Sequence, residues 1–129
     1  MKTAAELAVE SVTRVRAGDR EGWLGLFPED GWVQDPVGKS PTDPTGLGHR
    51  GKAAIIKFYD NVIAHNKGFD FTLNKVIPGG DDEAAVLITF HLVSPDGKKR
   101  DIQAINHYAR TKDGKLASLR SFWNFSDLD

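Results

Sequence analysis

Cysteine is absent from this chain of 129 residues. Its absence excludes disulfide bonds, thiolate nucleophiles and cysteine-based zinc sites. The formal net charge is only −1, so the chain lacks the positive field expected when nucleic acid is the main partner. No apolar run approaches membrane-spanning length, and the charged N-terminal stretch MKTAAELAVESVTRVRAGD does not fit a secretory signal. We therefore expect a cytoplasmic protein that does not associate with membranes.

The sequence also lacks the features that define a metal site or a dinucleotide site. The histidines His49, His65, His91 and His107 are not spaced as a metal-binding pair. Residues 46–51 spell GLGHRG, which matches the dinucleotide pattern G-x-G-x-x-G, but no buried strand precedes them. The sequence therefore predicts neither a metal site nor a dinucleotide cofactor.

The hydrophobic pattern of the first half of the chain is helical. It predicts a helix over about residues 3–17, a short second helix capped by Asp19, and a third helix over about residues 52–65. A short strand ending at Asp35 separates the second helix from the third. Residues 38–51 are rich in glycine, proline, serine and threonine and are expected to form a long loop.

The second half of the chain alternates apolar and polar residues in four runs, around Phe71, Ile88, Ala104 and Leu119. The turn sequences PGGDD, SPDGK and KDG separate them. The pattern predicts a single α+β domain over residues 1–129. In it, a curved, cone-shaped, mixed but mostly antiparallel sheet wraps around three N-terminal helices and encloses an apolar pocket.

Several polar side chains fall on faces that should be buried. Asn106 shares a strand face with Tyr108, where its amide serves either a structural hydrogen bond or a ligand. Asp35 shares a face with Val33, and it is either a turn residue before Pro36 or a general base in an apolar cavity. Spacing alone favours the turn.

Ser11 interrupts the apolar stripe of the first helix, where a core serine bonded to the backbone is the usual case. Tyr59 and Trp123 have core spacing, and packing is their default role. Each of these three residues gains functional interest only if it lines a cavity.

The ordered set of motifs resembles one known family. Ala17-Gly18-Asp19 with Trp23, the stretch VQDPVG at 33–38, Gly51-Lys52 with Phe58-Tyr59, and GKL at 114–116 leading to SFW at 121–123 carry the resemblance. Together they are similar to the ketosteroid isomerase branch of the SnoaL-like, or nuclear transport factor two-like, superfamily. The resemblance spans nearly the whole chain.

The resemblance implies a steroid delta-isomerase-like function. In the family, the aspartate of the D-P-x-G motif removes a proton beside a ketone and returns it two carbons away, and Asp35 occupies that position. A tyrosine and a protonated aspartic acid hold the developing oxyanion in the family. Their positions here are Ser11 and Asn106. The resemblance therefore implies that Asp35 is the base and that Asn106 is a donor on the oxyanion side.

Both donor positions depart from the family pattern. Asn106 is a neutral donor that needs no raised pKa. The hydroxyl of Ser11 is too short to reach where a phenol would, so either water bridges the gap or Tyr108 or Tyr59 supplies a phenol. Loss of one oxyanion donor typically lowers the rate by about 10²–10³.

The resemblance also implies a pocket wall suited to a flat apolar ligand such as a steroid. The expected substrate-binding residues are Ser11, Val15, Phe27, Phe58, Tyr59, Ile63, Phe90, Tyr108, Leu119 and Trp123. The loop over residues 39–49 is either a lid or inert surface. A homodimer is expected by analogy with relatives, and no cofactor is implied.

Two other functions stay open at this stage. The same cavity and base would suit cyclase or dehydratase chemistry on a polyketide-like ligand. A non-catalytic dimer that binds a steroid or another apolar ligand would need the pocket but no base with a raised pKa.

Overall fold

A computed structural model describes residues 1–66 and 68–129. Three helices precede the long strands: α1 (Ala4–Arg16), α2 (Arg20–Leu24) and α3 (Lys52–Phe58). A π-helical turn, η1 (Tyr59–Ile63), continues α3, and a short 3-10 helix, η2 (Phe125–Leu128), lies near the C-terminus. The strands are β1 (Trp32–Gln34), β2 (His49–Arg50), β3 (Gly68–Gly79), β4 (Glu83–Val93), β5 (Lys99–Arg110) and β6 (Leu116–Phe122).

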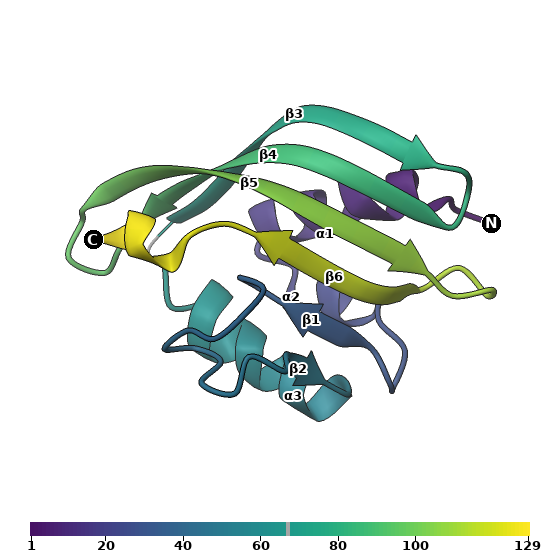
Figure 1. The fold of residues 1–129 in the computed structure, drawn as a ribbon, viewed down its shortest axis with the longest axis horizontal. Coiled ribbons are helices and arrows are strands. Elements are labelled where there is room, and N and C mark those ends of the chain that lie inside the picture. The colour runs from purple at the N-terminus through teal and green to yellow at the C-terminus, as the bar shows by residue number, and fades with distance from the viewer. Residues whose placement is uncertain (67) are drawn as a thin grey trace.

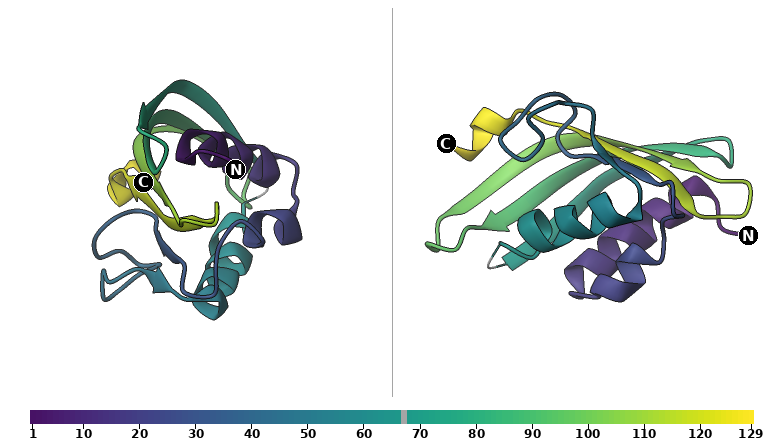
Figure 2. Two further views of the ribbon diagram at one scale, coloured as in Figure 1. Left: turned by 90° about the vertical axis from the view of Figure 1, so that its right-hand side faces the viewer. Right: turned by 90° about the horizontal axis from the view of Figure 1, so that it is seen from below.

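The six strands form one sheet in the order β2-β1-β6-β5-β4-β3. The pair β1–β6 is parallel, and the other pairs are antiparallel. The long strands β3, β4 and β5 arch over the helices, and α1 and α3 lie against the hollow side of the sheet (Figures 1 and 2). The predicted α+β fold with a curved, mostly antiparallel sheet is confirmed.

Helix α1 begins and ends as its sequence predicts. Thr3 accepts a hydrogen bond from the Glu6 backbone, and the Glu6 side chain accepts one from the Thr3 backbone, which completes a capping box. Gly18 follows the helix with φ of +67°, a conformation that glycine adopts without steric strain. The stripe containing Ser11 is buried against the sheet, so Ser11 is directed toward the interior.

The third helix differs from its prediction. Its last turn is π-helical: the Ala64 N–H donates to the Tyr59 carbonyl at 2.8 Å, five residues back. The wider turn ends at Ile63, not at His65. The spacing of hydrophobic residues could not predict the π turn, because Tyr59 and Ile63 would share a face in an α-helix as well as in a π-helix.

The concave face of β5 is buried as predicted and carries Ile102, Ala104, Asn106 and Tyr108. The opposite face carries the histidines. His91 hydrogen-bonds Asp101 at 2.8 Å, and His107 hydrogen-bonds Glu83 at 2.8 Å, both on exposed positions of the outer surface. The prediction that His91 and His107 lie outside the cone is confirmed.

The loop after β1 is tied to that strand. The Gly48 N–H donates to the buried Asp43 carboxylate at 2.9 Å, and the Gln34 amide donates to the Gly46 carbonyl at 3.1 Å. Gly48 lies against the Trp32 indole, where a Cβ would come within 2.2 Å of the ring nitrogen. The glycines of the G-x-G-x-x-G pattern therefore serve loop packing. Within residues 1–66 and 68–129, no helix combines the length and apolarity needed to cross a membrane.

Candidate functional site

Two adjoining pockets, called here the inner and the outer chamber, lie between the helices and the concave face of the sheet. The inner chamber has a volume of about 40 Å³ and the outer chamber about 170 Å³. Four residues border both, namely Asp35, Ile63, Phe69 and Phe90. Asp35 therefore stands at the junction, where a ligand that extends from one chamber into the other would pass it.

The Asp35 carboxyl is positioned by the end of β6. The Trp123 indole N–H donates to Asp35 Oδ1 at 2.5 Å. Two residues after Asp35, the Val37 N–H donates to the Ser121 carbonyl at 2.8 Å, which fixes the segment that follows β1 against β6. The Asp35–Pro36 peptide bond is cis. The aspartate that ends the predicted strand is thus held facing the chambers.

The surroundings of Asp35 change its acidity. Burial raises the pKa of its carboxyl from 3.8 to about 6, while the hydrogen bond from Trp123 opposes that rise by stabilising the ionised form. A carboxylate with a pKa near neutrality exchanges protons readily with a weakly acidic carbon. Asp35 therefore has the acidity and the position of a general base.

A cluster of polar side chains lies on the wall of the inner chamber. Ser11, Asn106 and Tyr108 all line it, and Ser11 reaches it from α1 whereas the other two come from β5. The Asn106 amide nitrogen donates to the Tyr108 phenol oxygen at 3.1 Å, and the Ser121 hydroxyl donates to Asn106 Oδ1 at 2.5 Å. The Trp23 indole N–H donates to the Ser11 hydroxyl at 3.0 Å. Each of these buried groups has at least one hydrogen-bond partner, as is usual for buried polar groups.

The Tyr108 phenol remains protonated over a wide pH range. Its pKa is raised to about 12, mainly by burial and also by the nearby Asp35 charge, while Asn106 and Ser11 act in the opposite direction. The inner chamber therefore contains one group that ionises near neutrality, Asp35, and one phenol that stays neutral.

Aromatic side chains form much of the remaining wall. Phe71 meets Phe90 edge-to-face with ring centroids 5.6 Å apart, and Phe90 meets Trp123 in the same way at 6.2 Å. Phe125 stacks on Trp123 at 5.6 Å. Rings in this arrangement present flat apolar surfaces, which suit a flat apolar ligand.

The chambers bring together most of the residues expected from the sequence. Those lining the inner chamber are Ser11, Val15, Asp35, Phe58, Ile63, Phe90, Asn106, Tyr108 and Leu119. Trp123 lines the outer chamber. Phe27 and Tyr59 line neither chamber. Each packs on Trp23 instead, with ring centroids 4.8 Å and 5.5 Å from that of Trp23.

Sequence reasoning missed Ser121 and Trp23, which hold the polar side chains in place. A signal existed for Ser121, because alternation puts it on the same face as Leu119, and a serine there is as unusual as Asn106 on the neighbouring strand. Asn61, Asn66 and Thr42 of the outer chamber had no such signal, since they lie in a loop and at the end of a helix.

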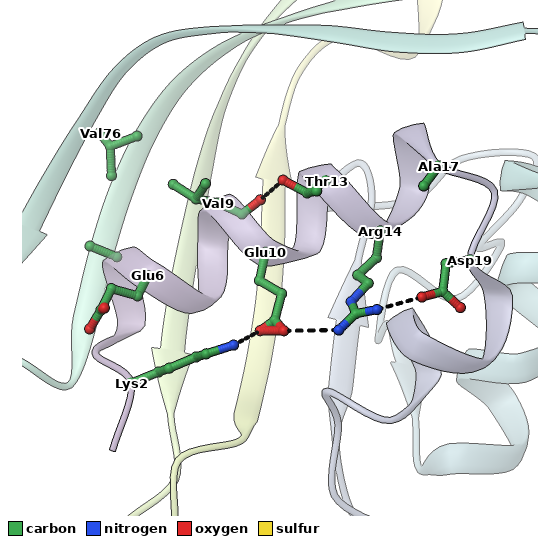
Figure 3. Close-up of a pocket in the computed structure, with 10 residues that line it drawn as sticks. Lys2, Glu6, Val9, Glu10, Thr13, Arg14, Ala17, Asp19 and Val76 are labelled. Carbon is green, nitrogen blue, oxygen red and sulfur yellow. Dashed lines mark hydrogen bonds and ion pairs between the residues drawn. The ribbon is translucent and has the colours of Figure 1, made fainter.

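A wider depression lies on the exposed side of α1, with a volume of about 700 Å³ (Figure 3). Most of its charged side chains pair with one another: Arg14 bonds Asp19 at 2.6 Å and Glu10 at 3.3 Å, and Lys2 bonds Glu10. It is an open groove whose charges are mostly paired already, so its size does not make it the candidate site. Across residues 1–66 and 68–129, no group of three or more histidine or acidic side chains could hold a metal ion.

Comparison with known proteins gives consistent matches. The family model described as "SnoaL-like domain" matches residues 8–119. The structure is similar to RV0760c from Mycobacterium tuberculosis, solved in complex with estradiol-17beta-hemisuccinate, with 33% identity, a TM-score of 0.91, and coverage of 98% of this chain and 97% of that one.

Two further structures are equally informative. The Delta 5-3-ketosteroid isomerase from Mycobacterium sp. is 32% identical with a TM-score of 0.89, and the match covers 98% of this chain and 97% of that one. A computationally designed 17-OHP binder is 31% identical with a TM-score of 0.90, and the match covers 98% of this chain and 96% of that one.

Proposed function

Because this chain belongs to the SnoaL-like domain family of the nuclear transport factor two-like superfamily, we propose that it is a steroid delta-isomerase-like enzyme. The reaction moves a carbon–carbon double bond into conjugation with a ketone by intramolecular proton transfer. The single observation that carries the proposal is the Asp35 carboxyl, whose pKa burial raises to about 6 at the junction of two apolar chambers.

Asp35 acts as the general base. It removes the proton from the carbon between the ketone and the double bond, and the electron pair of that C–H bond delocalises onto the carbonyl oxygen. The protonated Asp35 then returns the proton to the far carbon of the double bond, and the carbonyl re-forms. The carbon skeleton and the oxidation state are unchanged, so the cycle needs no cofactor.

Asn106 acts on the oxyanion side. One of its amide hydrogens bonds Tyr108 at 3.1 Å, and Ser121 fixes the amide orientation by donating to Oδ1. The second amide hydrogen is available for the substrate oxygen. A neutral carboxamide donates at every pH, whereas a carboxylic acid in that position would first need a raised pKa.

The substrate class follows from the chamber walls. The rings of Phe71, Phe90 and Trp123 meet edge-to-face along the wall, and flat fused rings pack well against such surfaces. RV0760c was solved with an estradiol derivative, and the Mycobacterium enzyme is named as a ketosteroid isomerase. A steroid or steroid-like ketone is therefore the ligand we propose.

The test is an ultraviolet assay of conjugated-enone formation from a β,γ-unsaturated 3-ketosteroid, run beside an equilibrium titration with the product steroid. We expect Asp35→Asn to lose turnover and keep binding. Asp101→Asn, on the outer face of the sheet, is the matched control and should keep both. Turnover that persists in Asp35→Asn would remove Asp35 from its role as base.

A second candidate function is ligand binding without turnover. The observation that favours it is the designed 17-OHP binder, which shares 31% identity with this chain and the same fold. The same pair of measurements separates the two: steroid binding with no enone formation in the unmodified protein would favour binding alone.

We also propose that the protein is a homodimer that pairs through the outer face of the sheet. Leu87, Ile105 and Phe122 lie in register across β4, β5 and β6, and their exposed fractions are 39%, 53% and 44%. A row of large apolar side chains on a sheet surface is typical of a surface that another protein covers.

A further inference from the structure

The polar wall of the inner chamber contains a phenol whose hydrogen bonds can be counted one by one. Tyr108 is 1% exposed and lines the inner chamber together with Asp35. Its ring rises from β5 two residues after Asn106, on the same strand face. Its hydroxyl is thus in the same small space as the carboxyl that we propose as the base.

The donors around the phenol can be assigned from chemistry. An indole N–H only donates, so the Ser11 oxygen accepts the bond of 3.0 Å from Trp23. Ser11 keeps its own hydroxyl hydrogen and lines the inner chamber together with Tyr108, where it acts to lower the pKa of the phenol. Ser11 is therefore fixed by Trp23, with its own hydrogen left for the phenol.

The second donor to the phenol is equally well defined. The Ser121 hydroxyl donates at 2.5 Å to Asn106 Oδ1, and only the oxygen of an amide can accept. The Asn106 nitrogen consequently faces Tyr108 and donates to the phenol oxygen at 3.1 Å. The phenol oxygen thus accepts from Asn106, and Ser11 is a second donor on the same chamber wall. The one remaining hydrogen is the phenol's own, and the bonds formed by the described side chains leave it free for the chamber.

We propose that Tyr108 is the second catalytic donor of this site and bonds the carbonyl oxygen of the substrate. Ser11 acts through it as a positioning residue. This inference rests on the proposed isomerase function. In it, Tyr108 supplies the phenol that Ser11 itself cannot provide. As the C–H bond breaks and its proton passes to Asp35, the electron pair moves to the carbonyl oxygen, which then holds the negative charge between the Tyr108 O–H and the Asn106 N–H.

The charge balance of the site agrees with this role. Asp35 is negative before proton transfer and neutral after it, while the substrate oxygen becomes negative. Tyr108 keeps its proton throughout, because its pKa of about 12 lies far above that of Asp35. A neutral donor that is already oriented needs no reorganisation when the charge develops, which is the condition for strong electrostatic stabilisation.

The experiment compares Tyr108→Phe with Tyr59→Phe. Each removes one phenol hydroxyl and keeps the ring, and the chain has only two tyrosines. Tyr59 packs on Trp23 outside the two lining sets, so its variant is the matched control. We expect Tyr108→Phe to lower kcat of the enone assay by about 10²–10³ with little change in KM. Tyr59→Phe should stay within about threefold of the unmodified protein.

A binding measurement makes the result independent of turnover. The probes are 2-naphthol, a flat ring system with one oxygen, and naphthalene, which has the same shape without it. Tyr108→Phe should weaken 2-naphthol binding by about tenfold, the effect of one hydrogen bond, and leave naphthalene binding unchanged. Retained naphthalene binding also shows that the variant has folded with its chamber intact.

Ser11 is tested with two variants of the same shape. Ser11→Thr keeps the hydroxyl and Ser11→Val lacks it, so any effect of the added methyl group is common to both. We expect kcat about tenfold lower in Ser11→Val than in Ser11→Thr, with similar KM values. Equal kcat values would show that Ser11 does not act through Tyr108.

The outcomes separate this inference from the proposed function. Turnover that is unchanged in Tyr108→Phe, with 2-naphthol bound as tightly as before, overturns the role of Tyr108 and leaves the isomerase proposal standing. No turnover in the unmodified protein overturns the isomerase proposal. In that case, selective loss of 2-naphthol binding in Tyr108→Phe still supports Tyr108 as the donor to a ligand oxygen, and its absence overturns that role too.

Discussion

The Trp123 indole nitrogen donates to Asp35 Oδ1 at 2.5 Å, across the junction of β6 and the segment after β1. The bond orients one carboxyl oxygen and stabilises the ionised form. Burial acts in the opposite direction and is the larger influence, so the pKa of Asp35 is raised to about 6. The pKa of the proposed base therefore depends both on its burial and on the Trp123 hydrogen bond, and a change in either should shift it.

The first prediction concerns the pH dependence of turnover. Asp35 must be ionised to remove a proton, and its pKa is about 6 in the folded protein. We expect kcat/KM for the β,γ-unsaturated ketosteroid to rise with pH, to reach half its plateau near pH 6, and to fall about tenfold for each further unit of acidity. A rate profile that is flat between about pH 5 and pH 8 would contradict Asp35 as the base.

The second prediction moves that midpoint. Trp123→Phe keeps an aromatic ring in the chamber wall and removes the N–H that stabilises the Asp35 carboxylate. The pKa of Asp35 should rise, so the midpoint of the kcat/KM profile should shift to higher pH. Trp32→Phe is the control, because it also removes an indole N–H, from a tryptophan that bonds the Leu47 carbonyl outside the chambers. Its midpoint should stay where it is in the unmodified protein.

The third prediction concerns stability. The pKa of Asp35 is higher in the folded protein, about 6, than the ordinary value of 3.8. The stabilising effect of the proton is therefore fully present below about pH 4 and is lost as the pH rises through about 6. Asp35→Asn removes this titration. Because the carboxyl is partly exposed to the chambers, we expect an effect on the order of 2 kcal/mol, less than the full shift would give.

The measurement is chemical denaturation of both proteins at several pH values. The free energy of unfolding of Asp35→Asn, relative to that of the unmodified protein, should increase between about pH 4 and pH 8. Other carboxylates titrate identically in the two proteins and cancel in the difference. A difference that stays constant with pH would mean that the Asp35 carboxyl has an ordinary pKa.

The fourth prediction tests the proposed dimer. Ile105 lies at the centre of the exposed row, opposite Leu87 on β4 and Phe122 on β6. Ile105→Lys should weaken self-association by about tenfold or more in sedimentation equilibrium, since it places a charge in an apolar contact. Leu47→Lys alters an equally apolar exposed side chain in the loop, 65% exposed, and should leave the association unchanged. If the unmodified protein and Ile105→Lys are both monomeric at all concentrations, the proposed dimer is excluded.

The sequence predicts the polar wall of the inner chamber because alternation in a strand is a strict geometric rule. Asn106 and Tyr108 share a face two residues apart, and the helical stripe places Ser11 toward the interior. Their meeting in one chamber follows once α1 packs on the concave face of the sheet. The base is the harder case, since spacing alone favours a turn role for Asp35 and only the resemblance to the family motif makes it a candidate base.

Other parts of the site depend on packing that no periodicity encodes. Tyr59 and Ile63 share a helix face, yet Ile63 lines both chambers while Tyr59 packs on the Trp23 ring. Trp23 lies in α2 and Phe27 follows that helix. How far each ring reaches into the core depends on the volumes of the side chains packed around it. The division of the cavity into two chambers that meet at Asp35 is likewise a property of the assembled rings, so the sequence could predict a pocket but not its shape.

The parallel pairing of β1 with β6 has a consequence for how this chain folds. The two strands pair at Gln34 and Arg120, which are 86 positions apart in a chain of 129 residues, so the pair closes a very long loop. The entropy of such a closure grows only slowly with length, but contacts far apart in sequence form late. The hairpins β3–β4 and β4–β5 are local by comparison. During refolding, strand signals should therefore recover before Asp35 meets Trp123, and Trp123 fluorescence would time the completion of the chamber.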